Sequence, residues 1–402
     1  MSNLIKRYDD CRLCGHDNIE TIFSLGDQYV NDFVLEEKIG EGVLAPLEVC
    51  HCSNCDLTQL RHTAPQELLY SGFYWYRSGV TDTMKAALKE IVEEVYKEKN
   101  LNSDSVFFDI GANDGTMLSF CRKGETKVGC EPATNLQPLL AKVADISIND
   151  FWSADAFHCA MGDDLRKCDV VTAIGMFYDL DEPKKFVQDI AKVLNDDGIF
   201  IAQLMTLDPM IRKNDLGNLC HEHIEFYSYK SLVYMYESCG LEIYRVDENE
   251  INGGSYRIWA RKYQQGSISY SENTSVQDLI AFKDRIDNIK NQIVKFIKDE
   301  KSKGKITHVY GASTKGNVIL QYFGITPDLC PFASERSPEK FGRYTVGSWI
   351  PIVSEEESKA LKPDYYLVLP WAFFDEMYER ESEWRAGGGQ FIVPFPTMRI
   401  VQ

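Results

Sequence analysis

The chain has 402 residues, of which 44% are hydrophobic and 26% charged. This length exceeds one ordinary domain, so we expect two or three domains, each with a buried core. The formal net charge of -18 argues against nucleic acid as a partner, because a nucleic-acid-binding face is basic.

The beginning of the chain, Met1 to Arg7, lacks the apolar core and small residues of a secretory signal. No apolar run approaches the length of a membrane span. We therefore expect a cytoplasmic protein with no membrane partner. Its 12 cysteines are then metal ligands or small apolar side chains rather than disulfides. The prediction for assembly is a monomer or a weak homo-oligomer.

Two Cys-x-x-Cys pairs, Cys11 with Cys14 and Cys52 with Cys55, stand near the amino terminus. Each pair can offer two thiolates to one tetrahedral ion, and two pairs complete a four-thiolate zinc site. The long stretch between the pairs predicts a hairpin of its own. A redox motif would not explain the paired occurrence, and the acidic charge disfavours a nucleic-acid zinc finger. Four cysteines leave no open coordination position, so we expect structural zinc in a lobe of residues 1–72.

Residues 105–116 read as an apolar strand, a glycine turn and the start of a helix. Gly111 and Gly115 let the backbone approach a ligand, and the helix start offers free N–H groups. The D-x-G-x-x-x-G spacing differs from the G-x-G-x-x-G of dinucleotide sites, which disfavours NAD, the competing cofactor. The segment predicts the cofactor turn of a class I methyltransferase.

Glu131 ends a second predicted strand, about twenty residues after the turn, where a carboxylate can hold ribose hydroxyls. Further strands are expected over residues 149–151, 168–174 and 199–203. The order predicts an α/β, Rossmann-like domain over 73–268 that binds S-adenosylmethionine. The predicted cofactor-binding residues are Asp109, Gly111, Asn113, Gly115, Glu131, Pro132, Asp150 and Gln203.

His221-Glu222-His223 places two imidazoles around a carboxylate, in a chain with only 7 histidines. Imidazole is suited to moving a proton near neutral pH. A metal site of the His-Glu-x-x-His type is disfavoured, because these histidines stand at i and i+2 rather than i and i+4. A structural histidine pair with satisfied hydrogen bonds and a solvated loop remain as alternatives.

The last third of the chain predicts a connecting helix over 269–303, since apolar residues recur there at helical spacing. A carboxy-terminal α/β, Rossmann-like domain over 304–402 then begins with a strand, a glycine turn and a helix. The start of that helix can accept an anion such as a diphosphate. A tight turn that only packs the helix on the sheet is the alternative. Arg336 and Arg343 belong to the same anion site or to a solvated loop.

Together these motifs resemble the S-adenosylmethionine-dependent sugar C-methyltransferases, which act on nucleotide-linked 4-keto-deoxysugars. The resemblance covers nearly the whole chain in order. It rests on the two cysteine pairs with residues 56–60, and on residues 74–79, 109–115, 221–228, 252–257, 310–317 and 335–340. It implies a zinc lobe, a cofactor domain and a carboxy-terminal domain that encloses a nucleotide-sugar substrate.

The chemistry that the resemblance implies is proton removal alpha to a ketone, followed by methyl transfer to the resulting enolate carbon. The resemblance places the base at His223, with Glu222 beside it, and a catalytic tyrosine at Tyr74 or Tyr76. We expect His221 to stabilise the enolate oxygen. The predicted substrate-binding residues are Tyr178, Arg257, Lys315, Asn317, Arg336 and Arg343.

The chain departs from the better-known sugar enzymes at two positions. Cys220 stands directly before the triplet where they carry tyrosine, and Asp179 follows the fourth strand where they carry histidine. Both positions would surround the developing enolate, so Asp179 belongs to the predicted catalytic set. Two other functions stay open: O-methylation of a sugar or another small hydroxylated substrate, and a non-catalytic homologue that acts as a binding protein.

Overall fold

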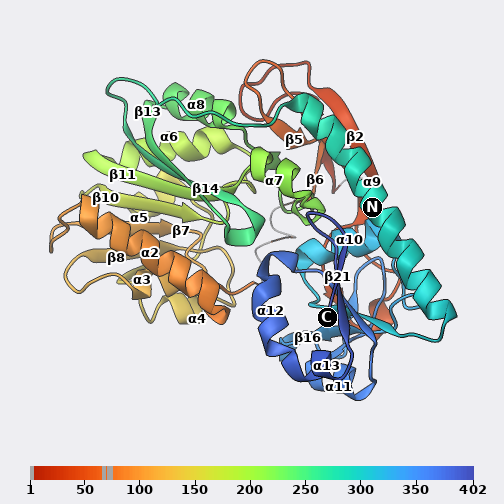
Figure 1. Cartoon of the computed structure of the whole chain (residues 1–402). Helices are drawn as coiled ribbons and strands as arrows, with labels where there is room; N and C mark the ends of the chain where they lie inside the picture. The colour runs from red at the N-terminus through yellow and green to blue at the C-terminus, as the bar shows by residue number, and fades with distance from the viewer. Residues whose placement is uncertain (1–3, 66–68, 70–75) are drawn as a thin grey trace.

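The computed structural model describes residues 4–65, 69 and 76–402, so the predicted catalytic Tyr74 lies outside the described residues (Figure 1). Among the described residues no helix combines the length and the apolar character needed to cross a bilayer. The described part of the chain forms three sheets of four or more strands, each accompanied by its own helices or loops.

The zinc lobe is built on an antiparallel sheet of four strands in the order β12-β5-β4-β2. The predicted hairpin between the cysteine pairs is confirmed, because β2 (Glu20–Tyr29) pairs antiparallel with β4 (Leu44–His51). The edge strand β12 (Glu225–Phe226) comes from the segment after His221-Glu222-His223 and pairs with β5 (Thr58–Leu60). The lobe is therefore completed by the chain that carries the histidine triplet.

The middle of the chain forms a seven-stranded sheet in the order β13-β14-β11-β10-β7-β8-β9. Strands β7 to β11 run parallel, and β14 runs antiparallel to both of its neighbours. The strand order reverses between β7 and β10, as in doubly wound sheets. The bounds are β7 Val106–Ile110, β8 Thr126–Cys130, β9 Ile146–Ile148, β10 Cys168–Ile174, β11 Leu194–Met205, β13 Leu241–Asn249 and β14 Ser255–Lys262.

Helices cover both faces of this sheet (Figure 1). Helices α5 (Ala154–Met161), α6 (Pro183–Val193) and α8 (Tyr229–Ser238) pack in one core on one face. Helix α2 (Asp82–Glu98), with the short α3 and α4, packs on the other face. The predicted Rossmann-like architecture is confirmed.

The third strand of this sheet differs from the prediction of 149–151, because β9 ends at Ile148. Asn149 lies just past the strand, where its Nδ2 donates to the carbonyls of Glu131 and Pro132, each at 3.1 Å. The side chain of Asp150 accepts from the backbone N–H of Phe151 at 2.7 Å. These polar side chains satisfy backbone groups of the loop, so the strand ends before them.

Helix α9 (Val276–Ser302) is the predicted connecting helix and starts with a capping box formed by Ser275 and Asp278. Its apolar face is buried in a core shared with the zinc lobe and the carboxy-terminal sheet. This face runs along β2 (Figure 1), where the rings of Phe23 and Phe282 are 6.2 Å apart. The cysteine pairs of the lobe instead pack in the core of the seven-stranded sheet. The lobe thus contributes to both cores.

The carboxy-terminal domain is a six-stranded sheet in the order β18-β16-β15-β19-β20-β21, parallel except for β21. The order reverses between β15 and β19, and α10 (Thr314–Phe323) begins just after β15. The predicted second Rossmann-like unit is confirmed. The strand bounds are β15 Thr307–Tyr310, β16 Ala333–Glu335, β18 Ile352–Ser354, β19 Tyr365–Val368, β20 Gln390–Val393 and β21 Arg399–Val401.

Short elements complete the described fold. One two-stranded ribbon joins the carboxy-terminal domain to the lobe, since β17 pairs with β3. The remaining bounds are β1 Lys6–Arg7, β3 Phe33–Val34, β6 His62–Thr63, β17 Tyr344–Thr345, α3 Thr116–Ser119, α4 Gln137–Leu140, α7 Leu207–Lys213, α11 Glu355–Ala360, α12 Phe374–Arg380 and α13 Ser382–Ala386.

Candidate active site

The two cysteine pairs meet in one cluster. The sulfur atoms of Cys11, Cys14, Cys52 and Cys55 all lie within 4.8 Å of one another, and three of these side chains are buried. Each pair ends in a tight turn, with a positive φ at Gly15 (70°) and Asp56 (69°). Four thiols at this spacing fit a tetrahedral zinc ion, with no ligand position left for water or substrate.

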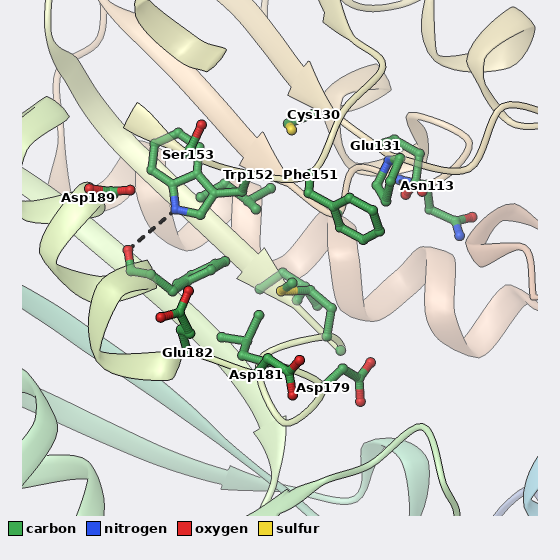
Figure 2. A pocket seen from close by; sticks show the side chains of 18 of the residues that line it. Asn113, Cys130, Glu131, Phe151, Trp152, Ser153, Asp179, Asp181, Glu182 and Asp189 are labelled. Carbon is green, nitrogen blue, oxygen red and sulfur yellow. Dashed lines mark hydrogen bonds between the residues drawn. The ribbon is translucent and has the colours of Figure 1, made fainter. Parts of the chain in front are cut away.

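A cavity of about 320 Å³ lies at the carboxyl ends of β7, β8 and β10, where the strand order reverses (Figure 2). Doubly wound sheets bind their ligands at this point. Four of the predicted cofactor-binding residues, Gly111, Asn113, Glu131 and Pro132, line the cavity, and the rings of Phe151 and Trp152 lie along it.

Glu131 is buried beside this cavity, and burial raises the pKa of its carboxyl group. Its two oxygens accept from the backbone N–H groups of Asn113 (2.9 Å) and Ala133 (2.8 Å). Each oxygen keeps a second acceptor position. Asn113 in turn accepts from the N–H of Ser78 at 3.0 Å and donates to the carbonyl of Tyr76 at 3.2 Å.

The other predicted cofactor residues have different positions. A Cβ on Gly111 would come within 2.8 Å of Met176 Cγ, so that wall requires glycine. Gly115 begins α3 at φ 78° and packs against Val143. Asp109 is buried beneath the turn, where it accepts from Thr172 Oγ1 at 2.7 Å and burial raises its pKa to about 7.

Asp150 and Gln203 also lie away from the lining of this cavity. Asp150 is exposed beyond β9. Gln203 lines a second cavity and accepts from Arg257 Nε at 3.0 Å. These two side chains, with Gly115 and Asp109, do not line the first cavity.

Two further cavities, of about 220 and 390 Å³, adjoin the first. Tyr76 and Gly175 line all three cavities, so the three meet at these residues. Tyr178 and His223 line the second and the third. The predicted base thus lines cavities that share Tyr76 and Gly175 with the predicted cofactor site.

His223 has a defined orientation. Its Nδ1 lies 3.0 Å from the carbonyl oxygen of Asn218 and 3.1 Å from Asn218 Oδ1. A carbonyl only accepts, so Nδ1 carries the proton and Nε2 keeps the lone pair of a base. Burial, assisted by the charge of Lys315, lowers the pKa of His223 to about 3. The Tyr178 ring packs edge-on at 4.5 Å between centroids.

Glu222 lines the third cavity and is held by two asparagines. Its Oε1 accepts from Asn31 Nδ2 at 2.7 Å, and Asn31 Oδ1 accepts from Asn317 Nδ2 at 2.6 Å. Asn317, a predicted substrate residue, therefore supports Glu222 from behind. Asn31 and Asn218 were not predicted, because nothing in their local sequence marks them.

His221 does not reach the cavities, which corrects its expected role on the enolate oxygen. Its imidazole is buried, with Nε2 at 3.0 Å from the carbonyl of Ala45 in β4, and burial lowers its pKa to about 4. The structural alternative fits this histidine. Cys220 is likewise buried behind the triplet, whereas Asp179 lines the first and third cavities.

The predicted basic residues divide into two groups. Lys315 lines the second cavity, with Nζ at 3.7 Å from Asp215 Oδ2. The buried Arg257 does not line that cavity, but its Nε donates to Gln203, which does. Arg336 is exposed and 3.7 Å from Glu376, while Arg343 donates to the carbonyl of Phe33 at 3.0 Å. These two arginines lie outside the lining of the three cavities, as the loop alternative predicts.

Three family models match consecutive parts of the chain: a putative zinc binding domain at residues 11–70, a methyltransferase domain at 80–246 and a C-methyltransferase C-terminal domain at 250–396. The C-methyltransferase NovU from Streptomyces niveus is 27% identical over 423 residues, which cover 100% of this chain and 99% of that protein.

Solved methyltransferase structures are similar to part of the chain. Magnesium protoporphyrin IX methyltransferase from Synechocystis, with bound S-adenosylmethionine, is 10% identical and covers 44% of this chain and 79% of its own, with a TM-score of 0.34. An S-adenosylmethionine-dependent methyltransferase from Clostridium acetobutylicum is 10% identical and covers 46% and 94%, with a TM-score of 0.35. Likenesses at these TM-scores add nothing to the assignment.

Because the three family models follow one another over residues 11–396, and a relative aligns with the chain from end to end, the protein belongs to the S-adenosylmethionine-dependent C-methyltransferases with a zinc-binding domain.

Proposed function

We propose that the protein transfers a methyl group from S-adenosylmethionine to the carbon beside the ketone of a nucleotide-linked keto-deoxysugar. The observation that carries this proposal is the position of His223, whose Nε2 lone pair is free of the Asn218 contact and whose ring lines two cavities that join the cofactor cavity at Tyr76 and Gly175. The motif resemblance to the sugar C-methyltransferases supports the substrate class.

The second cavity supports a nucleotide as the part of the substrate that carries the sugar and is retained through the reaction. It lies at the reversal of the carboxy-terminal sheet, between the residues that follow β15 and those that follow β19. The start of α10 with Lys315 suits a diphosphate, and the ring of Trp371 offers a face to a base. The two doubly wound sheets thus present one ligand site each to the same space around His223.

The proposed reaction begins at His223. Its Nε2 removes the proton alpha to the ketone, the C–H electron pair forms the enolate, and Asn218 holds Nδ1–H so that the imidazolium is stabilised. S-adenosylmethionine, when bound, supplies an electrophilic methyl group on sulfur. The enolate carbon forms the new C–C bond as the C–S bond breaks. Glu222 and Tyr76 orient the imidazole or the sugar, and Asp179 faces the same space.

A deuterium experiment tests the proposal against O-methylation. With S-adenosylhomocysteine in the cofactor site, nucleotide-linked 4-keto-6-deoxysugars in D₂O are expected to exchange the proton at the alpha carbon. An O-methyltransferase would not catalyse this exchange, and its product would lose a hydroxyl. If neither exchange nor methyl transfer occurs with any of these sugars, the protein is instead the binding-protein homologue.

Replacing Glu131 with glutamine is expected to weaken S-adenosylhomocysteine binding by about 10- to 100-fold, the effect of leaving a buried donor unpaired. Both carboxylate oxygens accept backbone N–H groups, and the glutamine amide offers only one acceptor oxygen. Isothermal titration calorimetry measures the change. Asp150→Asn, outside the cavity, is the matched control and should bind normally. Normal affinity of Glu131→Gln would contradict the cofactor assignment.

The pH dependence of kcat/KM should show no loss of the base between pH 8 and 5. Burial lowers the pKa of His223 to about 3, so the neutral form that accepts a proton persists until the pH falls toward that value. An ordinary histidine would lose half of its base form near pH 6.5. Initial rates across this range, with circular dichroism to confirm folding, check the expectation. An inflection near 6.5 that disappears in His223→Asn would contradict it.

A further inference from the structure

The segment 175–182, between β10 and α6, forms a wall shared by the candidate cofactor cavity and the candidate base. Asp179, Asp181 and Glu182 lie on one side of the cofactor cavity (Figure 2). Tyr178, in the same segment, packs against the ring of His223. The position of this segment therefore affects both sites.

The segment is held from one side by the chain of the histidine triplet. The carbonyl oxygen of Tyr178 accepts from the backbone N–H groups of both Ile224 (3.0 Å) and Glu225 (3.1 Å). These two residues enter β12 of the zinc-lobe sheet. The segment is thus coupled to the lobe through its backbone at Tyr178.

Arg12 of the zinc lobe holds the segment a second time, at Asp181. Its side chain is fully buried, and Nη1 lies 2.9 Å from Asp181 Oδ1. The hydroxyl of Tyr8 donates to the same oxygen at 3.1 Å, and the guanidinium lies 3.6 Å from the centre of the Tyr8 ring. An ion pair whose guanidinium is buried and stacked on a ring fixes the direction of the carboxylate as well as its distance.

The position of Arg12 depends on the cysteine cluster, because Arg12 stands between Cys11 and Cys14. Its backbone N–H donates to Gln59 Oε1 at 2.9 Å, and its Nη2 donates to the carbonyl of Leu60 and to Thr63. A zinc ion bound by the four thiolates would fix the turn that carries Arg12. Without the ion, the turn and the guanidinium lose their fixed position.

We infer that Arg12 is a positioning residue that fixes the wall of the cofactor cavity through Asp181, and thereby links zinc occupancy of the lobe to cofactor affinity. Zinc bound by the four cysteines then affects cofactor affinity as well as the folding of the lobe. The inference rests on the cofactor site proposed above and is independent of the sugar substrate, so failure of the sugar assignment leaves it unchanged.

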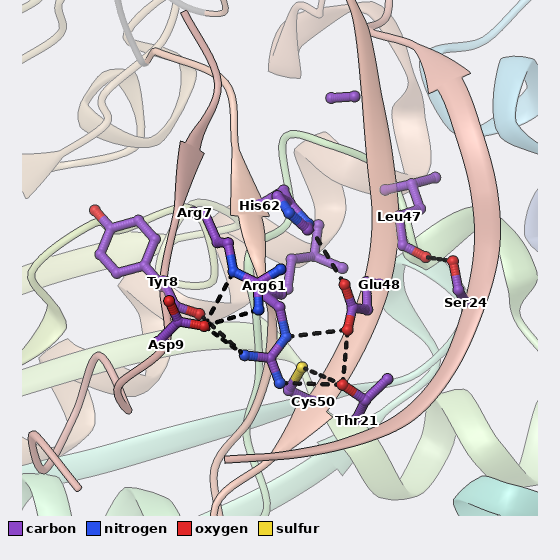
Figure 3. A network of polar contacts seen from close by, with 12 residues as sticks. Arg7, Tyr8, Asp9, Thr21, Ser24, Leu47, Glu48, Cys50, Arg61 and His62 are labelled. Atoms are coloured by element: carbon purple, nitrogen blue, oxygen red, sulfur yellow. Dashed lines mark hydrogen bonds and ion pairs between the residues drawn. The ribbon is translucent and has the colours of Figure 1, made fainter. Parts of the chain in front are cut away.

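Arg61 is a matched control in the same lobe (Figure 3). It is also buried and paired, with Nε at 3.0 Å from Glu48 and Nη1 at 3.1 Å from Asp9. Its remaining bonds, to the carbonyls of Tyr8 and Ile19 and to the hydroxyl of Thr21, stay within the lobe as well. A loss of Arg61 also removes a buried guanidinium with its ion pairs, but leaves the bond between Arg12 and Asp181 in place.

The experiment compares S-adenosylhomocysteine binding by calorimetry in the zinc-loaded full chain. Arg12→Met and Asp181→Asn should each weaken binding about 10-fold, and the double variant no more than either, because both act through one contact. Arg61→Met should lower the melting temperature yet leave the affinity within about 2-fold, since the Arg61 side chain makes no bond to Asp181 or to Arg12. Its bond to the Tyr8 carbonyl, at 3.5 Å, is backed by the main-chain bond from the Tyr8 N–H to the Arg61 carbonyl, which the variant keeps. Additive effects of Arg12→Met and Asp181→Asn would overturn the inference, because Asp181 would then act on the ligand alone.

Zinc removal provides the second measurement, and it decides the outcome if Arg12→Met does not fold. Chelation should weaken S-adenosylhomocysteine binding in the unaltered protein. In Asp181→Asn the same treatment should cause little further loss, because the ion pair is already lost. Equal losses in both proteins, or none in the unaltered protein while zinc analysis shows complete removal, would overturn the link between zinc and the cofactor.

Discussion

His223→Asn is expected to lower turnover by about 10²- to 10⁴-fold, the usual contribution of a general base. Asparagine keeps a polar side chain beside Asn218 but has no lone pair of comparable basicity at the position of Nε2. The S-adenosylhomocysteine affinity should stay unchanged, since His223 lines the second and third cavities and not the cofactor cavity. Single-turnover assays and calorimetry measure the two quantities.

His221→Asn is the matched control for this experiment. It removes the neighbouring histidine of the same triplet, which is buried against the carbonyl of Ala45. We expect reduced thermal stability with turnover retained. The assignment of the base would be wrong if His223→Asn kept near-full activity, or if His221→Asn lost the alpha-proton exchange while remaining folded.

Cys52→Ser is expected to release zinc and to destabilise the lobe by several kcal/mol, because binding free energy at a structural zinc site is folding free energy. The four sulfurs converge within 4.8 Å, and the lobe has no disulfide among its described cysteines to replace the ion. Zinc content measured by mass spectrometry should fall from one ion per chain. Thermal unfolding should show the loss of stability.

The adjacent Cys50 offers the control for the zinc experiment. It is buried to the same degree, but its sulfur faces Thr21 Oγ1 at 3.7 Å and lies outside the cluster. Cys50→Ser should therefore retain one zinc ion. Full zinc content in Cys52→Ser, or its loss in Cys50→Ser, would require a different ligand set.

Much of the fold follows from local sequence patterns. The strand and turn at residues 105–116, the amphipathic connecting helix and the two cysteine pairs are each specified by residues close together in the chain, and each is found where the pattern places it. The predicted strand over 149–151 lies beyond the observed end of β9. Asn149 and Asp150 terminate the strand through side-chain hydrogen bonds, which the alternation of apolar residues does not reveal.

The candidate site was less predictable, because its members come from distant parts of the chain. The sequence identifies the triplet as unusual, but the two histidines differ only in what packs around them: a β4 carbonyl for His221 and Asn218 for His223. Asn31 supports Glu222 across 191 positions of sequence, and Arg12 reaches Asp181 across 169. Such contacts depend on how the sheets dock, which local patterns do not specify.

The two cores described above also divide the surroundings of the candidate site. The cofactor cavity is built on the core of the seven-stranded sheet, whereas the residues flanking His223, such as Leu219, Cys220 and Ile224, pack in the core of α9 and the carboxy-terminal sheet. The candidate cofactor site and the candidate base therefore rest on different cores. The zinc lobe packs into both cores, so a substitution in its interior can disturb the surroundings of either site without touching a ligand.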